Sequence, residues 1–125
     1  MKIQIAVAAL LCLFASDAFA AGSVLSISEY STMASTDTGG AAGQMAAEPA
    51  ITDQPLVDFS GGVASSAAFS SRTRFIRVSC SVRCAIKFGI IGSTTATTAN
   101  KPLGVDSAEY FGVLPGNVVS VIAAP

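Results

Sequence analysis

Within residues 74–89, RFIRVSCSVRCAIKFG, an apolar side chain recurs at every second position. Successive side chains of a β-strand point to opposite faces, so this alternation buries one face and leaves the other in water. The sixteen residues would span roughly 50 Å if extended, whereas a typical strand has about 5–6 residues. We therefore predict two strands, residues 74–79 and 83–89, joined by a tight link near Ser81. The apolar positions are Ile76, Val78, Cys80, Val82, Cys84, Ile86 and Phe88.

Further short segments with strand character lie on both sides of this stretch, separated by Gly, Pro and Ser. Leu114-Pro115-Gly116 is typical of a tight turn. The sequence shows no amphipathic helix, and many short strands separated by turns are typical of a sandwich, jelly roll or small barrel. We predict an all-β fold, a small antiparallel β-sandwich or jelly-roll-like domain with an extended N-terminal arm. The further predicted strands are residues 24–28, 56–59, 65–69, 109–113 and 117–122.

Three segments of different composition divide the chain. Residues 1–20 have the pattern of a secretory signal, with Lys2, an apolar stretch and an Ala18-Phe19-Ala20 cleavage site. Residues 21–55 are predicted to be an extended Gly/Ala/Ser-rich arm with one short strand, and residues 56–125 a β-domain. In the arm, Met33 and Met45 are interpreted first as cover for the domain's own core, and alternatively as anchors on a neighbouring subunit.

The chain carries little charge. It is 51% hydrophobic, 12% charged and has a net charge of −1, whereas charged residues make up about 25% of a typical domain. Such a surface suits packing against other subunits, although a Ser/Thr-rich exterior is an equal alternative. The dispersed basic residues do not favour nucleic-acid binding. Arg74 shares the alternate face of Ile76, and the basic cluster is interpreted as a solvated strand face rather than an anion site; its members are Arg72, Arg74, Arg77 and Arg83.

No arrangement of residues points to catalysis. The sequence has no His, which removes the commonest general base and metal ligand. No Ser lies in a G-x-S-x-G turn. Asp106 and Glu109 are the nearest carboxylates to each other but do not form a recognisable acid–base or calcium motif. We predict a protein that is not an enzyme, with no catalytic residues, no cofactor, no metal and no small-molecule substrate.

Cys80 and Cys84 are a candidate disulfide. In one straight strand their Cα atoms would lie about 13 Å apart, whereas a disulfide requires less than about 7 Å. A bend at Ser81 and Val82 would bring them together, and an oxidising compartment would permit the bond. Two buried free cysteines acting as small hydrophobic side chains are the favoured interpretation, and the disulfide is the alternative.

The order of several short motifs resembles a family of small structural proteins of tailed-bacteriophage virions. The motifs are SISEY (26–30), SSAAF (65–69), RFIRV (74–78), CAIKFG (84–89), TTATT (94–98), EYFGV (109–113) and PGNVVSVIA (115–123). The resemblance covers residues 24–123 and implies a compact β-fold attached to a particle, as a capsid decoration (cement) subunit or a head–tail accessory. The implied partners are the major capsid protein or another head or tail component, and a homo-oligomer is expected.

Two functions follow as expectations. The first is a non-enzymatic virion protein that assembles in the host cytoplasm and packs on other virion subunits. The alternative is an exported periplasmic or surface β-domain that binds a protein or a glycan, which the leader and the candidate disulfide favour. Virion proteins do not normally need export, so the leader has three explanations that stay open: a mis-called start near Val24, a functional leader on an exported domain, or a hydrophobic segment retained inside the particle.

Overall fold

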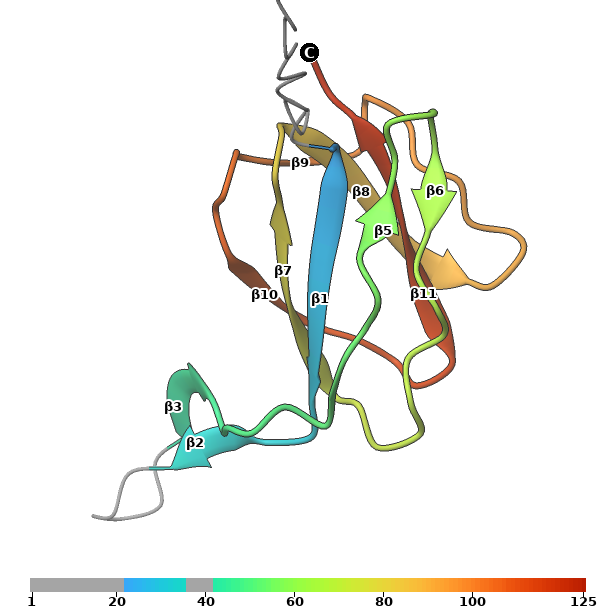
Figure 1. The fold of residues 1–125 in the computed structure, drawn as a ribbon. Helices are drawn as coiled ribbons and strands as arrows, with labels where there is room; N and C mark the ends of the chain where they lie inside the picture. The colour runs from blue at the N-terminus through green and yellow to red at the C-terminus, as the bar shows by residue number, and fades with distance from the viewer. Residues whose placement is uncertain (1–21, 36–41) are drawn as a thin grey trace, which may run out of the picture.

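A computed structural model describes residues 22–35 and 42–125 of the chain, and these residues form eleven β-strands (Figure 1). The predicted leader, residues 1–20, and its cleavage site lie outside the described residues. In chain order the strands are β1 (Val24–Tyr30), β2 (Met33–Ser35), β3 (Ala42–Ala46), β4 (Thr52–Asp53), β5 (Val57–Asp58), β6 (Ala64–Ser65), β7 (Phe75–Cys80), β8 (Cys84–Ile90), β9 (Lys101–Leu103), β10 (Glu109–Gly112) and β11 (Asn117–Ala123).

The strands form two main antiparallel sheets, which confirms the predicted all-β fold. The first sheet has the order β10-β7-β1-β4, with β5 also paired to β1. The second has the order β6-β11-β8-β9. The two sheets face each other, and a separate pair, β2 and β3, extends from one end of them (Figure 1).

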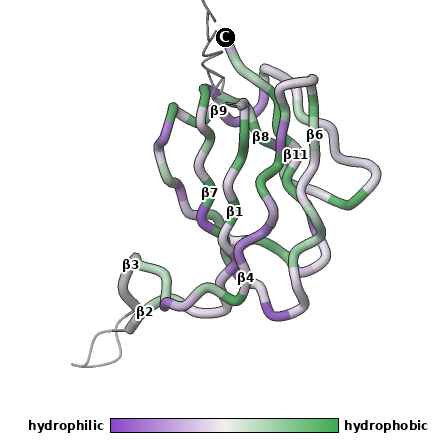
Figure 2. The backbone as a smooth tube through the Cα atoms, in the orientation of Figure 1, coloured by the Kyte–Doolittle hydropathy of each residue, from purple (hydrophilic) through white to green (hydrophobic). Residues whose placement is uncertain are grey.

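The hydrophobic core lies between the two sheets. Hydrophobic residues are concentrated along β1, β7, β8 and β11 (Figure 2). The alternation that predicted the two central strands holds, because its positions in β7 and in the first half of β8 are almost fully buried. The core residues are Leu25, Ile27, Val57, Phe59, Phe69, Ile76, Val78, Cys80, Cys84, Ile86, Leu103, Val119 and Val121.

The two central strands are adjacent in sequence but belong to different sheets. β7 ends at Cys80 and β8 begins at Cys84, so the link of three residues carries the chain from the first sheet to the second. This change of sheet is the bend that brings the two cysteines together. Their Cα atoms lie 6.4 Å apart and their sulfurs form a disulfide. The structure therefore contains the disulfide rather than the two free thiols that we favoured from the sequence.

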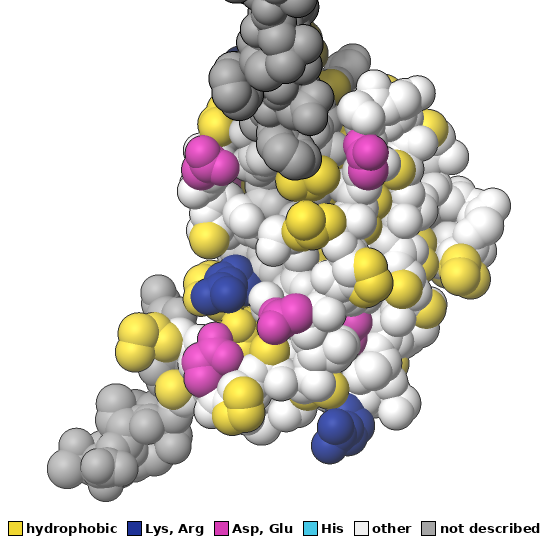
Figure 3. Space-filling model, viewed as in Figure 1, with side chains coloured by type: hydrophobic (Ala, Val, Ile, Leu, Met, Phe, Trp, Pro, Cys, Tyr) yellow, Lys and Arg dark blue, Asp and Glu magenta, His cyan; other side chains and the backbone are white. Residues whose placement is uncertain are grey.

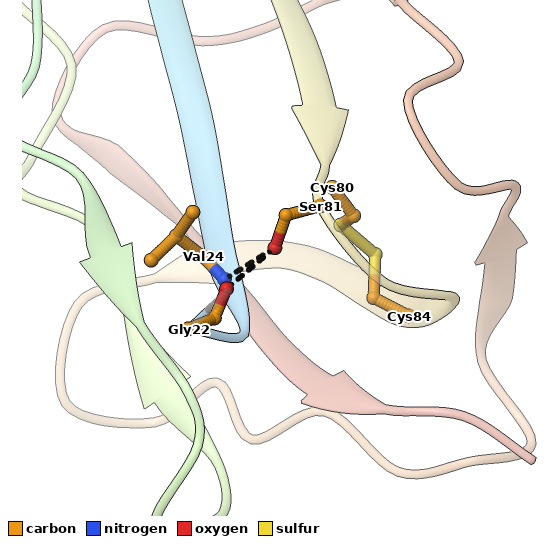
Figure 4. The surroundings of a disulfide bond; sticks show 5 residues. All are labelled: Gly22, Val24, Cys80, Ser81 and Cys84. Carbon is orange, nitrogen blue, oxygen red and sulfur yellow. Dashed lines mark hydrogen bonds between the residues drawn. A yellow bond between two sulfur atoms is a disulfide. The ribbon is translucent and has the colours of Figure 1, made fainter. Parts of the chain in front are cut away.

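The link between the cysteines also holds the start of the first strand. Ser81 Oγ accepts a hydrogen bond from the Val24 N–H at 2.9 Å and donates one to the Gly22 carbonyl at 2.7 Å (Figure 4). The Ser81 N–H in turn donates to the Val24 carbonyl at 3.0 Å. At the same end of the sheets, the Ala124 N–H donates to the Arg83 carbonyl at 3.0 Å. The disulfide link thus fixes β1 and the residues that follow β11.

The expected boundary between an arm and a β-domain at residue 56 does not match the sheets. β1 and β4 both precede that boundary, and β1 is a central strand that pairs with β7 from Leu25 to Tyr30. The sequence hid this role because Glu29 interrupts the apolar pattern of Leu25 and Ile27 although it is buried. What extends from the sheets is the β2–β3 pair, which is less of the chain than the predicted arm (Figure 1).

Other differences concern short strands. β6 spans residues 64–65 and shares only Ser65 with the strand that we predicted at 65–69, and β9 lies in a segment where we predicted no strand. The predicted turn at 114–116 is present between β10 and β11, with Gly116 at φ 80°. In residues 22–35 and 42–125 we find no helix with the length and apolar character needed to cross a membrane.

Candidate functional site

A pocket of about 320 Å³ opens at the end of the two sheets that carries the β10–β11 turn. We call it the end pocket. It lies where the interior between the sheets reaches the surface, beyond the last fully packed core residues. Its lining combines mostly apolar residues with one arginine and one asparagine: Phe69, Arg74, Phe88, Gly112, Val113, Leu114 and Asn117.

Strand alternation explains why these residues meet. Arg74 precedes β7 and has the parity of Ile76 and Val78, whose side chains are buried in the interior. Asn117 begins β11 and has the parity of the buried Val119 and Val121. The interior faces of both sheets therefore end in polar residues at this end.

The wall opposite Arg74 is aromatic. Phe88 lies in β8 and packs against the core, and Phe111 of β10 lies beside it with ring centroids 5.2 Å apart. Phe69 closes the inner side and is 3% exposed. Its backbone is fixed to β11, because its N–H donates to the Asn117 carbonyl at 2.8 Å. Leu114, at the rim, is 69% exposed.

The Arg74 guanidinium is oriented by the loop before β7. Its Nη1 donates to the Ser71 carbonyl at 3.0 Å and to the Thr73 carbonyl at 3.1 Å. The Arg74 backbone is fixed as well, because its N–H donates to the Tyr30 carbonyl at 2.9 Å. Among the residues that the structure describes, no carboxylate forms an ion pair with Arg74. The end pocket thus carries a positively charged group and no acidic side chain in its lining.

A buried carboxylate supports the loop that forms the inner wall. Glu29 of β1 is 2% exposed. Its Oε1 accepts a hydrogen bond from Gln54 Nε2 at 2.6 Å, and its Oε2 accepts from the Ser70 N–H at 2.9 Å and from the Thr73 hydroxyl. Gln54 also contacts Ala67 with both of its amide atoms at 3.2 Å. This network fixes residues 67–73, and with them Phe69 and Arg74.

The β2–β3 pair presents two exposed methionines. Met33 is 48% exposed and Met45 is 69% exposed, so the interpretation that they cover the domain's own core is wrong. The chain returns from β3 to the sheets through Glu48, whose Oε1 accepts a hydrogen bond from the Tyr30 hydroxyl at 2.7 Å. Burial raises the pKa of Tyr30, and the hydrogen bond to Glu48 raises it further.

The other residues considered from the sequence lie away from the end pocket. Cys80 and Cys84 lie at the opposite end of the sheets, where β7 ends and β8 begins. Glu109 lies 3.9 Å from Lys101 Nζ in an exposed ion pair. Asp106 lies in the link before β10, with its N–H bonded to the Cys80 carbonyl. Within the described residues, no three His, Cys, Asp or Glu side chains gather in a way that would hold a metal ion.

Sequence reasoning singled out Arg74 as part of a basic cluster but did not predict the end pocket. Arg74 was recognised as sharing the face of Ile76, but it was grouped with the solvated cluster. In the structure Arg72, Arg74 and Arg83 are all exposed, which fits that interpretation, and Arg74 in addition lines the end pocket. The parity of Arg74, opposite to that of Arg77, separates the two arginines but does not by itself predict a pocket.

Comparisons with protein-family models, with curated proteins and with solved structures found no match to this chain.

Proposed function

We propose that this chain is a non-enzymatic structural subunit that packs on other protein subunits, in the virion of a tailed phage as the motif resemblance implies. The observation that carries the proposal is the β2–β3 pair, which extends from the sheets and exposes Met33 and Met45 (Figure 1). Exposed, flexible apolar side chains on a projecting element suit insertion into a neighbouring subunit.

The character of the surface supports the same proposal. Few charged side chains appear on the face shown in Figure 3, and hydrophobic side chains are dispersed among uncharged polar groups. Interface cores are depleted of charge relative to the rest of a protein surface, and Met is enriched in them. Repeated copies on a particle would be arranged by the particle's symmetry, which fits the expected homo-oligomer.

The proposal is tested by following the two methionines into particles. Met33→Ser and Met45→Ser together should lower the amount of the chain that copurifies with particles from its native source, while the melting temperature of the isolated protein stays within error of the wild type. Leu56→Ser is the matched control, because Leu56 is also exposed, at 64%, but lies between β4 and β5 rather than on the β2–β3 pair. Equal recovery of all three proteins with particles, or the absence of the wild type from particles, would contradict the proposal.

A second candidate is the exported β-domain that binds a protein or glycan. The observation that favours it is the disulfide between Cys80 and Cys84, because disulfides persist mainly in oxidising compartments. The chain has no Trp and two Tyr, so aromatic platforms for a sugar are scarce. The N-terminal peptide and intact mass separate the two candidates: a periplasmic chain that begins at Ala21 supports export, and a chain in particles that begins near Val24 supports the virion subunit.

A further inference from the structure

We propose that the end pocket binds an apolar group that carries a carboxylate, with the carboxylate on Arg74 and the apolar part between Phe69 and Phe88. This is separate from the packing function proposed above, because the β2–β3 pair and the end pocket share no residue. The ligand is either a small arylalkyl carboxylate or the apolar C-terminal residue of a polypeptide, which present the same chemistry.

The size and lining of the pocket determine which apolar group the ligand can carry. A volume of about 320 Å³ is at the lower end of the range of about 300–1,000 Å³ for small-molecule sites. Two of its walls are the aromatic rings of Phe69 and Phe88, and a third is Val113. Aromatic rings pair favourably with another ring in offset or edge-to-face geometry. A single aromatic group therefore fits the space.

The charge of the pocket determines the polar group of the ligand. Arg74 is the one charged residue in the lining, and Asn117 is the one neutral polar side chain. A guanidinium presents five N–H donors in a planar fork that matches a carboxylate. Among the described residues, the Arg74 guanidinium donates through Nη1 alone, to the Ser71 and Thr73 carbonyls, which hold the group in place without neutralising it. An anionic oxygen at the mouth of the pocket would complete this arrangement.

The nearest buried acid does not compete for this cation. Glu29 lies on the neighbouring strand β1 and also faces the interior. In the β1–β7 register it is opposite Ile76, which is two residues after Arg74. Its two oxygens already accept bonds from Gln54, Ser70 and Thr73. The internal network thus satisfies its own carboxylate, and Glu29 forms no ion pair with Arg74, which lines the pocket.

The test uses the ¹⁵N-labelled full chain and two probes of equal shape, 3-phenylpropionate and the uncharged 3-phenylpropanamide. We expect the acid to shift the backbone amides of Phe69, Phe88 and residues 112–114, and to bind about tenfold or more tightly than the amide, because a hydrogen bond to a charged group is much stronger than a neutral one. Shifts at another surface, no shifts up to the solubility of the acid, or equal affinity for acid and amide would overturn the proposal.

Substitutions then assign the effect to one side chain. Arg74→Met should reduce the affinity for the acid to that for the amide, and Arg74→Lys should keep part of the preference because the charge remains. Arg72→Met is the matched control, because Arg72 is an exposed arginine two residues away that does not line the pocket; it should bind as the wild type does. Equal losses in both Met variants would overturn the assignment. If Arg74→Met fails to fold, the acid–amide comparison on the wild type still decides.

The two sources of the ligand are separated with a third pair of probes. Acetyl-Gly-Gly-Phe with a free α-carboxylate is compared with its C-terminal amide at the same sites. Tighter binding of the peptide acid than of 3-phenylpropionate would assign the pocket to a polypeptide terminus, and weaker or equal binding would assign it to a small free carboxylate. A peptide amide that binds as tightly as the peptide acid would count against a carboxylate site.

Discussion

Removing the Glu29 carboxylate is the perturbation that most directly tests how this end of the fold is held together. In Glu29→Ala, the Ser70 N–H loses its hydrogen-bond partner, while Gln54 and Thr73 each keep one other partner, the Ala67 carbonyl and Ser70 Oγ. An unsatisfied buried donor costs about 1–3 kcal/mol and each lost bond about 0.5–1.5 kcal/mol. We therefore expect the free energy of unfolding to fall by about 3 kcal/mol, a large part of the roughly 5–15 kcal/mol of a typical domain.

Glu29→Gln tests the same network with almost no change of shape. A glutamine offers one acceptor oxygen instead of two, so its amide would face either the Gln54 amide or the Ser70 N–H and Thr73 hydroxyl. Rotating the Gln54 amide does not help, because its Oε1 accepts from the Ala67 N–H. At least one donor thus meets another donor, and we expect a smaller loss of about 1–2 kcal/mol.

Both losses are measured by urea unfolding, with the midpoint and slope fitted by linear extrapolation. Glu109→Gln is the control, because Glu109 is partly exposed and its contact to Lys101 is an exposed ion pair at 3.9 Å; such pairs contribute about 0–1 kcal/mol. An unchanged slope with a clearly lower midpoint for Glu29→Ala would support the reasoning. A Glu29→Ala midpoint equal to that of Glu109→Gln would refute it.

Two further predictions concern the disulfide and the buried tyrosine. Replacing Cys80 and Cys84 together by Ala should lower the free energy of unfolding by about 2 kcal/mol, the loop-closure value for so short a loop. A variant as stable as the wild type, or a wild type whose Cys80 and Cys84 titrate as free thiols, would contradict this. Because its folded-state pKa is raised above the unfolded value of about 10, the contribution of Tyr30 to stability is complete below pH 10 and is lost as the pH rises through the folded-state pKa. Tyr30→Phe should therefore flatten the alkaline decline of stability above pH 10, and an identical decline in both proteins would contradict the assignment.

The parts of the fold that the sequence predicted are those with an unbroken alternation. In β7 and in the first half of β8 the core residues recur at every second position. The Leu114-Pro115-Gly116 turn lies between β10 and β11. The central position of β1 was not predictable in the same way. Glu29 stands where an apolar residue would continue the pattern, and its burial becomes acceptable only through Gln54, Ser70 and Thr73, which are far from it in the sequence.

For the end pocket, the sequence could predict which face of the strand Arg74 lies on, but it could not predict the site. Parity places Arg74 on the interior face from the sequence alone, but a charged residue at the start of a strand usually reaches solvent. Phe69, Phe88 and Asn117 come from a loop and two strands whose proximity depends on the β8–β11 pairing and on the Phe69–Asn117 backbone bond. Such long-range pairings leave no mark in a local pattern, because alternation fixes the face of a strand but not its neighbours.

The link between the two cysteines shows how one short segment decides both the topology and the position of that pocket. Between Cys80 and Cys84 the chain leaves one sheet and enters the other, so Arg74 and Phe88, at the far ends of the two strands, come to face each other across the interior. At the link the layers are held together by the disulfide and by the bonds of Ser81 to Gly22 and Val24 (Figure 4). At the far ends the described residues have no disulfide between the layers, which are joined there by the backbone of the β6–β7 loop and the β10–β11 turn. Phe69, placed there by the Glu29 network, closes the interior in part and leaves a space bordered by a cation.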